Sequence, residues 1–94
     1  MTTANDILDE AAGMLSARAN DRDQPDGERS MGKIVECFNI ATGHNLSERD
    51  GWLFMVFLKA VRAATTPQGK LDDYVDGAAY FGLAGEAGHK GGDV

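Results

Sequence analysis

The sequence predicts an all-α protein, a compact four-helix bundle-like domain in which the third and fourth helices form a central antiparallel hairpin. Apolar residues recur at helical spacing along most of the chain, and the alternation typical of strands is nearly absent. The chain has 94 residues, of which 43% are hydrophobic, a length that suits one domain. We therefore expect residues 1–94 to form a single all-α domain.

The first helix is predicted over residues 4–19. Its apolar residues form one stripe at helical spacing, comprising Ile7, Leu8, Ala11, Met14 and Leu15. Thr3 can cap this helix, and Asp6 three residues later completes the pattern of a capping box. Residues 20–29 follow as a polar connector without an apolar anchor, so we expect this segment to be mobile.

The second helix is predicted over residues 31–42, with Ser30 as its N-cap and Gly43 as its stop signal. One face of this helix is apolar and comprises Met31, Ile34, Val35, Phe38 and Ala41. Cys37 flanks that face, and we expect its thiol to be partly buried and inert. Because Cys37 is the single cysteine, no intramolecular disulfide can form, which fits a reducing cytosol.

The third helix is predicted from a Ser47 N-cap, with Asp50 three positions on, to about Ala64. Its run from Trp52 to Leu58 places large apolar groups on every side of the helix. One small chain can hardly enclose such a helix, so other helices must surround it or a subunit contact must bury it. We expect a homodimer or a higher homo-oligomer.

The last helix is predicted over residues 71–87, after a turn that contains Pro67. Small residues recur along it at helical spacing, at Ala78, Gly82 and Gly85. We expect them to form its inner face, because they would let a neighbouring backbone approach closely. The Gly-rich tail over residues 88–94 has nothing to bury, and we expect it to be disordered.

The charge and hydropathy of the chain exclude several classes of partner. Its 15 acidic and 9 basic residues give a formal charge of −6, and the basic residues are not gathered in one region. Binding to nucleic acid is therefore not expected, although the acidic ends leave DNA mimicry as an alternative to simple solubility. The apolar run from Trp52 to Leu58 is far shorter than the ~20 residues that cross a bilayer, and no export signal opens the chain. We expect a cytoplasmic protein without membrane contact.

Charged residues match across the predicted hairpin. When two antiparallel helices fold about a turn over residues 65–70, residues at equal distances from its centre face one another. Arg62 then meets Asp73, and Lys59 meets Asp76. Lys59 and Arg62 are three residues apart, and so are Asp73 and Asp76. This spacing places the two cations on one face of their helix and the two carboxylates on one face of theirs. The spacing therefore predicts two stacked ion pairs along the hairpin.

Two interpretations of these charges stay open. In the first they only fix the hairpin register, and each partly exposed pair contributes about 0 to 1 kcal/mol. In the second they line a pocket for a small anionic or nucleotide-like ligand. The candidate ligand-binding residues are Lys59, Arg62, Asp73, Asp76, Tyr80 and Arg49. We predict no catalytic set, because His44, the one histidine outside the predicted tail, has no Ser or Cys partner at a readable spacing. We predict no metal site and no cofactor either, since a lone cysteine offers no cluster for zinc.

Several sequence blocks follow one another within residues 29–86. They are Gly32-Lys33, Phe38-Asn39, Gly51-Trp52-Leu53-Phe54-Met55, Leu58-Lys59-Ala60-Val61-Arg62 and Asp72-Asp73-Tyr74-Val75-Asp76-Gly77-Ala78-Ala79-Tyr80. Together they resemble a family of small uncharacterised all-helical proteins of tailed bacteriophages and prophages. The Leu-Lys-x-x-Arg block paired with Asp-x-x-x-Asp-x-x-x-Tyr is the most specific part. The resemblance implies a viral origin and an all-helical fold rather than a chemistry.

A second resemblance concerns the two aspartates of the last helix. Asp73-x-x-Asp76 is similar to one carboxylate pair of the all-α nucleotide pyrophosphohydrolases, whose helical hairpins hold magnesium on a triphosphate between two such pairs. This chain departs from that pattern, because Lys59 and Arg62 stand where the facing carboxylates would be. Cations there supply the charge that a metal would bring. A divalent-metal-dependent pyrophosphohydrolase-like enzyme is therefore an alternative only.

These observations together favour a non-enzymatic phage-type binding protein that sequesters or blocks a host component in the bacterial cytoplasm. The first candidate target is a host protein complex of antiviral defence or transcription, met by the acidic first helix and the connector. The alternative target is a nucleotide signal, held between subunits by Lys59, Arg62, Arg49 and Tyr80. The pyrophosphohydrolase-like enzyme is the third possibility.

Overall fold

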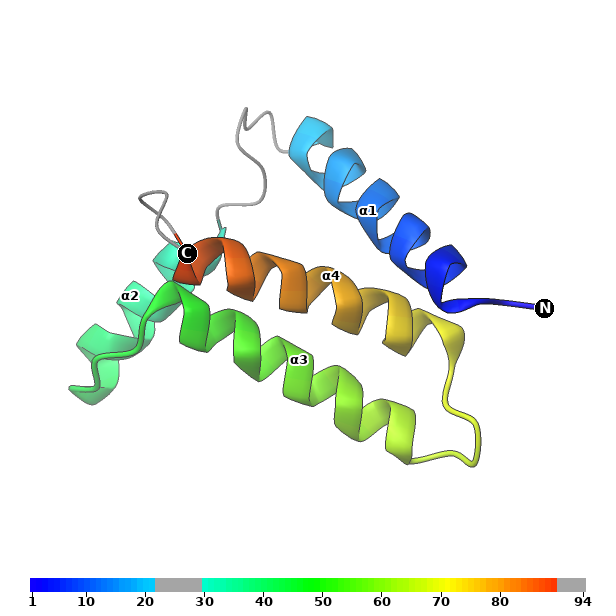
Figure 1. Cartoon of the computed structure of the whole chain (residues 1–94). Coiled ribbons are helices and arrows are strands. Elements are labelled where there is room, and N and C mark those ends of the chain that lie inside the picture. The colour runs from blue at the N-terminus through cyan, green and yellow to red at the C-terminus, as the bar shows by residue number, and fades with distance from the viewer. Residues whose placement is uncertain (22–29, 90–94) are drawn as a thin grey trace.

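Four helices make up the fold that the sequence predicts. The structure, a computed structural model, describes residues 1–21 and 30–89, with no strand among them. The helices are α1 (Ala4–Asp21), α2 (Ser30–Thr42), α3 (Glu48–Ala64) and α4 (Leu71–Gly88) (Figure 1). α1 extends two residues beyond its predicted end, and α4 one residue. The remaining residues of the predicted mobile connector and disordered tail, 22–29 and 90–94, lie outside the described residues.

Two capping boxes fix the starts of α1 and α3, as the sequence predicts. The backbone N–H of Asp6 donates to Thr3 Oγ1 at 3.1 Å, and the N–H of Thr3 donates to Asp6 Oδ2 at 3.0 Å. At α3, the N–H of Asp50 donates to Ser47 Oγ at 3.1 Å, and the N–H of Ser47 donates to Asp50 Oδ2 at 2.9 Å. Each box satisfies two donors, one at the cap residue and one in the first turn, so both helices begin at defined residues.

The link between α2 and α3 is short and well anchored. Gly43 ends α2 with a φ of 74°, a left-handed conformation that glycine adopts without strain. The Asn39 side chain then bridges to Leu46, donating from Nδ2 to its carbonyl oxygen at 2.9 Å and accepting from its N–H at 2.8 Å. These two hydrogen bonds hold the start of α3 against the side of α2.

The α3–α4 hairpin is central, as predicted. α4 lies between α1 and α3, and among the described helices the backbone of α2 lies closest to α3 (Figure 1). The larger core lies where α2, α3 and α4 meet, and it comprises Met31, Val35, Trp52, Tyr80, Leu83 and Ala84. A smaller core joins α1 to α4 and comprises Ala11, Val75 and Ala79. The hairpin therefore carries both cores, one on either side of α4.

The prediction that small residues form the inner face of α4 is wrong for two of the three residues, since Ala78 packs against the smaller core but Gly82 and Gly85 do not. Gly82 and Gly85 are exposed, and a Cβ built on either would meet no atom within 4 Å. α4 instead buries a set of mostly larger side chains, namely Asp73, Val75, Ala79, Tyr80, Leu83 and Ala84. Because α1 and α3 pack on two separate sides of α4, its buried residues cover a wider arc than one small-residue stripe.

The close helix approach occurs at Gly51 of α3. A Cβ built there would collide with the Met31 side chain and would lie 2.8 Å from Val35 Cγ1. Real Cβ atoms essentially never come that close to a neighbour, so only glycine allows α2 to cross α3 at this distance. This crossing forms one wall of a cleft described below.

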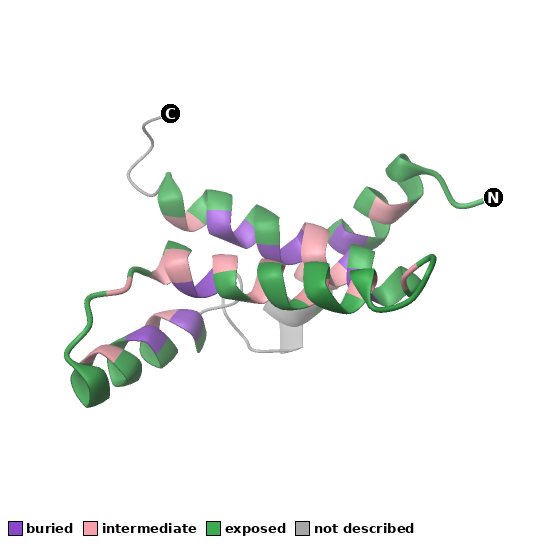
Figure 2. Cartoon of the chain, turned by 90° about the horizontal axis from the view of Figure 1, so that it is seen from below, coloured by how far each residue is buried: buried purple, intermediate pink, exposed green. Residues whose placement is uncertain are grey.

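Much of the apolar surface of α3 is not enclosed within one chain. Trp52 is only 5% exposed, whereas Phe54 and Phe57 are each 62% exposed and Val61 is 64% exposed. Figure 2 shows exposed residues along much of α3, with the buried ones confined to the contacts between helices. None of the helices in residues 1–21 and 30–89 has the length and hydropathy to cross a bilayer. The open face of α3 leaves the predicted subunit contact available.

Candidate functional site

The charged residues of the hairpin meet near its turn. Lys59 of α3 places its Nζ 2.9 Å from Oδ2 of Asp76 and 3.7 Å from Oδ1 of Asp73 on α4. The Lys59 side chain is only 12% exposed, so water screens these ion pairs less than it would at an open surface. The predicted pairing of Lys59 with Asp76 is confirmed, and it sets the register of α3 against α4.

The predicted pairing of Arg62 with Asp73 is wrong. Lys59 contacts both aspartates, and no ion pair of Arg62 is found among the described residues. Three residues along a helix turn the side chain by about 300°, so Arg62 lies about 60° around α3 from Lys59. Arg62 instead lines the rim of a recess of about 390 Å³ at the turn. That recess contains three basic and three acidic side chains, Lys59, Arg62, Lys70, Asp72, Asp73 and Asp76.

Two other candidate residues lie elsewhere. Tyr80 is buried in the larger core and stacks on Trp52, with ring centroids 5.8 Å apart and planes 21° apart. Arg49 lies in the first turn of α3, ten residues and about 15 Å along the helix from Lys59. It lines a separate recess of about 380 Å³ with Leu53, Phe81, Ala84, Gly85, Gly88 and His89. The six predicted ligand-binding residues therefore do not converge on one pocket.

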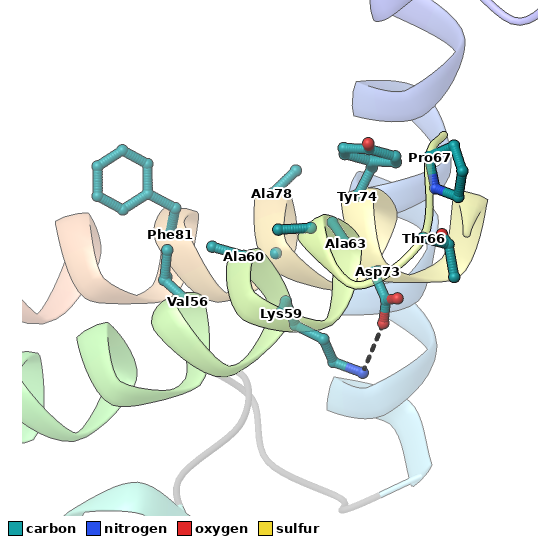
Figure 3. Close-up of a pocket in the computed structure, with 12 residues that line it drawn as sticks. Val56, Lys59, Ala60, Ala63, Thr66, Pro67, Asp73, Tyr74, Ala78 and Phe81 are labelled. Atoms are coloured by element: carbon teal, nitrogen blue, oxygen red, sulfur yellow. Dashed lines mark ion pairs between the residues drawn. The ribbon is translucent and has the colours of Figure 1, made fainter. Parts of the chain in front are cut away.

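An apolar groove follows the seam between α3 and α4 on one face of the hairpin. We call it the hairpin groove; it has a volume of about 670 Å³ and is lined by Val56, Lys59, Ala60, Ala63, Ala64, Thr66, Pro67, Asp73, Tyr74, Gly77, Ala78 and Phe81. Figure 3 shows Phe81 at one end of it, Tyr74 at the other, and small side chains between them. The Tyr74 hydroxyl donates to the Gln68 carbonyl at 2.8 Å, and Lys59 pairs with Asp73. Its polar side chains are thus largely satisfied within the chain.

A second apolar recess lies between α2 and α3, and the sequence reasoning did not find it. We call it the α2–α3 cleft; it has a volume of about 330 Å³ and is lined by Met31, Ile34, Val35, Phe38, Leu46, Gly51, Phe54 and Met55. Every lining residue is apolar. Ile34, Phe38 and Phe54 remain 56%, 43% and 62% exposed at its walls. The signal for it was present in the apolar face predicted for residues 31–42, which α3 covers only in part.

The groups with reactive or metal-binding chemistry are dispersed. Within residues 1–21 and 30–89, no three His, Cys, Asp or Glu side chains lie close enough to hold one metal ion. The Lys59 ammonium instead lies beside both carboxylates of the Asp73-x-x-Asp76 pair. Cys37 is exposed, so the expectation that its thiol is partly buried is wrong. His44 stacks on Phe38, with ring centroids 5.8 Å apart.

Comparison with known proteins yields one match. A family described as "Domain of unknown function (DUF6378)" matches residues 6–88. No curated protein and no solved structure matches the chain. The viral origin and the relationship to pyrophosphohydrolases are not addressed by this match, and both stay predictions.

Proposed function

The chain belongs to the DUF6378 family, and from its structure we propose that it is a non-enzymatic binding protein that holds a helix of another protein in the α2–α3 cleft. The observation that carries the proposal is the composition of the cleft, whose eight lining residues are all apolar. A recess without a polar anchor does not select a small polar metabolite, because such sites fix orientation with precisely placed polar groups. The α2–α3 cleft instead suits the apolar face of a macromolecule.

The form of the cleft favours a helix as the bound element. Two helices form its walls, with Ile34 and Phe38 on one wall and Phe54 on the other. An amphipathic helix presents its apolar side chains at i, i+3, i+4 and i+7, a stripe that fits a groove between two helices. Met31 and Met55 also line the cleft, and flexible methionine side chains adapt their packing to a bound partner.

The charge of the chain indicates which helices would associate with it. At a formal charge of −6, the chain attracts partners with a basic surface and repels acidic ones. We therefore propose a partner helix with a basic polar face and an apolar stripe. Association should slow as salt is added, since ions screen attraction between separated surfaces.

The proposed origin of the partner, a bacterial host, rests on the resemblance of this chain to bacteriophage proteins. A small protein that covers an apolar helix of a partner prevents that helix from reaching its own binding surface. We propose that the partner is a bacterial host protein, held in the host cytoplasm in this way. Sequestration requires no chemistry beyond the cleft itself.

The nucleotide-binding alternative has weaker support. The recess at the hairpin turn has three acids beside three bases, so it does not present the net positive charge that attracts a phosphate group. The pyrophosphohydrolase-like alternative is weakened by Lys59, whose ammonium lies 2.9 Å from one of the two carboxylates that would face the metal.

Affinity capture from bacterial cells tests the proposal. We expect the tagged wild-type chain to retain one protein in near-equal amount, and Phe54→Glu to lose it, because a carboxylate in the apolar cleft opposes binding. Ile40→Glu is the matched control, since Ile40 is 80% exposed on α2 and does not line the cleft. Circular dichroism checks that both variants fold. Equal retention by Phe54→Glu and the wild type would contradict the proposal, as would an empty capture.

A further inference from the structure

The hairpin groove is an unpartnered face of the most central unit of the fold. None of its lining residues comes from α1 or α2. On α4, Leu71, Tyr74 and Phe81 are 43%, 45% and 62% exposed at helical spacing. On α3, Phe57 and Val61 continue the same surface outward, because Phe57 lies one turn before Ala60. The chain therefore leaves a continuous apolar face open along the hairpin.

This face has both a protruding group and a recess that could receive one. Phe81 stands between the hairpin groove and the recess beside Arg49, and it lines both. Towards the turn, the floor of the groove is formed by small residues, including Ala60, Ala63, Gly77 and Ala78, with no large side chain filling the space between them (Figure 3). A protruding aromatic ring and a shallow small-residue floor thus lie about one helical turn apart on one surface.

We propose that a second copy of this chain occupies the hairpin groove, with the two hairpins antiparallel about a two-fold axis. In a two-fold contact, the same surface patch of each copy packs against that of the other. Every side chain that one copy inserts is therefore matched by the same side chain from its partner. Phe81 of each copy would fill the small-residue floor of the other. The two α3–α4 hairpins would then form a four-helix bundle, the usual way in which helical hairpins bury an apolar face.

The exposed area is sufficient for such a dimer. Phe57, Val61, Leu71, Tyr74 and Phe81 are between 43% and 64% exposed. Together with the groove floor they offer roughly 500 Å² or more of apolar surface per copy, so two copies would bury about 1,000 Å², the lower bound for a specific interface. The charged groups of the groove, Lys59 and Asp73, neutralise each other, so the contact itself brings no like charges together.

This dimer is independent of the proposed function. The α2–α3 cleft shares no lining residue with the hairpin groove, so each copy in the dimer would keep its cleft accessible. Failure of one proposal therefore leaves the other standing.

The mass of the full chain in solution tests the dimer. Sedimentation equilibrium of the wild type should give about twice the chain mass of 10.0 kDa. Phe81→Glu should raise the dissociation constant at least about 30-fold, because it removes a central aromatic contact twice. Ile40→Glu should leave the dissociation constant unchanged. If the wild type sediments as a monomer at every soluble concentration, the proposal is overturned, and a different protein would have to be the occupant of the groove. A Phe81→Glu dimer as tight as the wild type would overturn it too.

A cross-linking measurement does not depend on the Phe81 variant. In a Cys37→Ser background, Ala78→Cys places a thiol on the groove floor, one turn from Phe81. A short bis-maleimide should join two such chains in high yield, whereas Gly13→Cys on exposed α1 should give little product. Equal yields from the two positions would contradict the arrangement.

Discussion

Lys59 of α3 lies with its ammonium nitrogen 2.9 Å from Asp76 Oδ2 of α4 and 3.7 Å from Asp73 Oδ1. One cation thus bridges two carboxylates that lie one turn apart on the facing helix. Because all three side chains are largely buried, sliding α3 along α4 by a turn would leave charges without partners. The bridge fixes the register of the hairpin, and with it the shape of the hairpin groove between α3 and α4.

Removal of the Lys59 charge should destabilise the fold. Lys59→Met keeps most of the apolar stem but leaves two neighbouring carboxylates without their cation, so the free energy of unfolding should fall by about 1–2 kcal/mol. Lys70→Met is the matched control, because Lys70 is exposed and lines the same recess. It should change stability by no more than about 0.5 kcal/mol. Urea unfolding measures both.

A double-mutant cycle isolates the contact itself. Once Lys59→Met has removed the cation, Asp76→Asn should cost less than it does in the wild type, because the interaction is already lost. Strict additivity of the two changes would show that Lys59 and Asp76 do not interact in solution.

Gly51 should be intolerant of a side chain. Gly51→Ala places a methyl group against Met31 and against Val35 Cγ1, and the overpacking should lower the free energy of unfolding by about 1–3 kcal/mol. Gly13→Ala on α1 meets no neighbouring atom and should instead stabilise the fold by up to about 1 kcal/mol. When Val35→Ala is combined with Gly51→Ala, the losses in free energy of unfolding caused by the two substitutions should not add. A Gly51→Ala variant as stable as the wild type would mean that α2 does not cross α3 so closely.

The capping box of α3 predicts a pH dependence. Hydrogen bonds from the Ser47 backbone N–H, and secondarily with the Ser47 side chain, hold the pKa of Asp50 below its ordinary value of 3.8. Ionised Asp50 therefore stabilises the fold fully above pH 3.8, and this contribution is lost as the pH falls through the lowered pKa. The melting temperatures of the wild type and Asp50→Asn should differ at neutral pH and converge in acid. Curves that stay parallel from neutral pH down to about pH 2 would contradict this role.

Local features of the fold were predictable from the sequence, because they depend on residues close together in the chain. Thr3 with Asp6 and Ser47 with Asp50 form capping boxes in the structure, and Gly43 ends α2 in a left-handed conformation. Helical periodicity placed all four helices to within about two residues of their observed ends. These features need no knowledge of how the helices pack.

Features that depend on the direction of packing were not predictable in the same way. The inner face of α4 was assigned to small residues, but α1 and α3 pack on two sides of α4 and leave Gly82 and Gly85 exposed. Likewise, equal distance from the turn does not say which side of α3 faces α4. Lys59 therefore meets both aspartates while Arg62 lies at the rim. The apolar face of residues 31–42 was predictable, but the α2–α3 cleft also depends on where α2 crosses α3 at Gly51, which local sequence patterns do not specify.

Site-specific photo-cross-linking from the α2–α3 cleft tests the central claim, protein binding in that cleft, most directly. A photoreactive benzoylphenylalanine at position 54 should attach the chain, in bacterial cells, to one protein, within an amphipathic segment whose polar face is basic. The same group at position 40, outside the cleft, should give no such product. Products that are identical from both positions, or no protein product from position 54, would contradict the account.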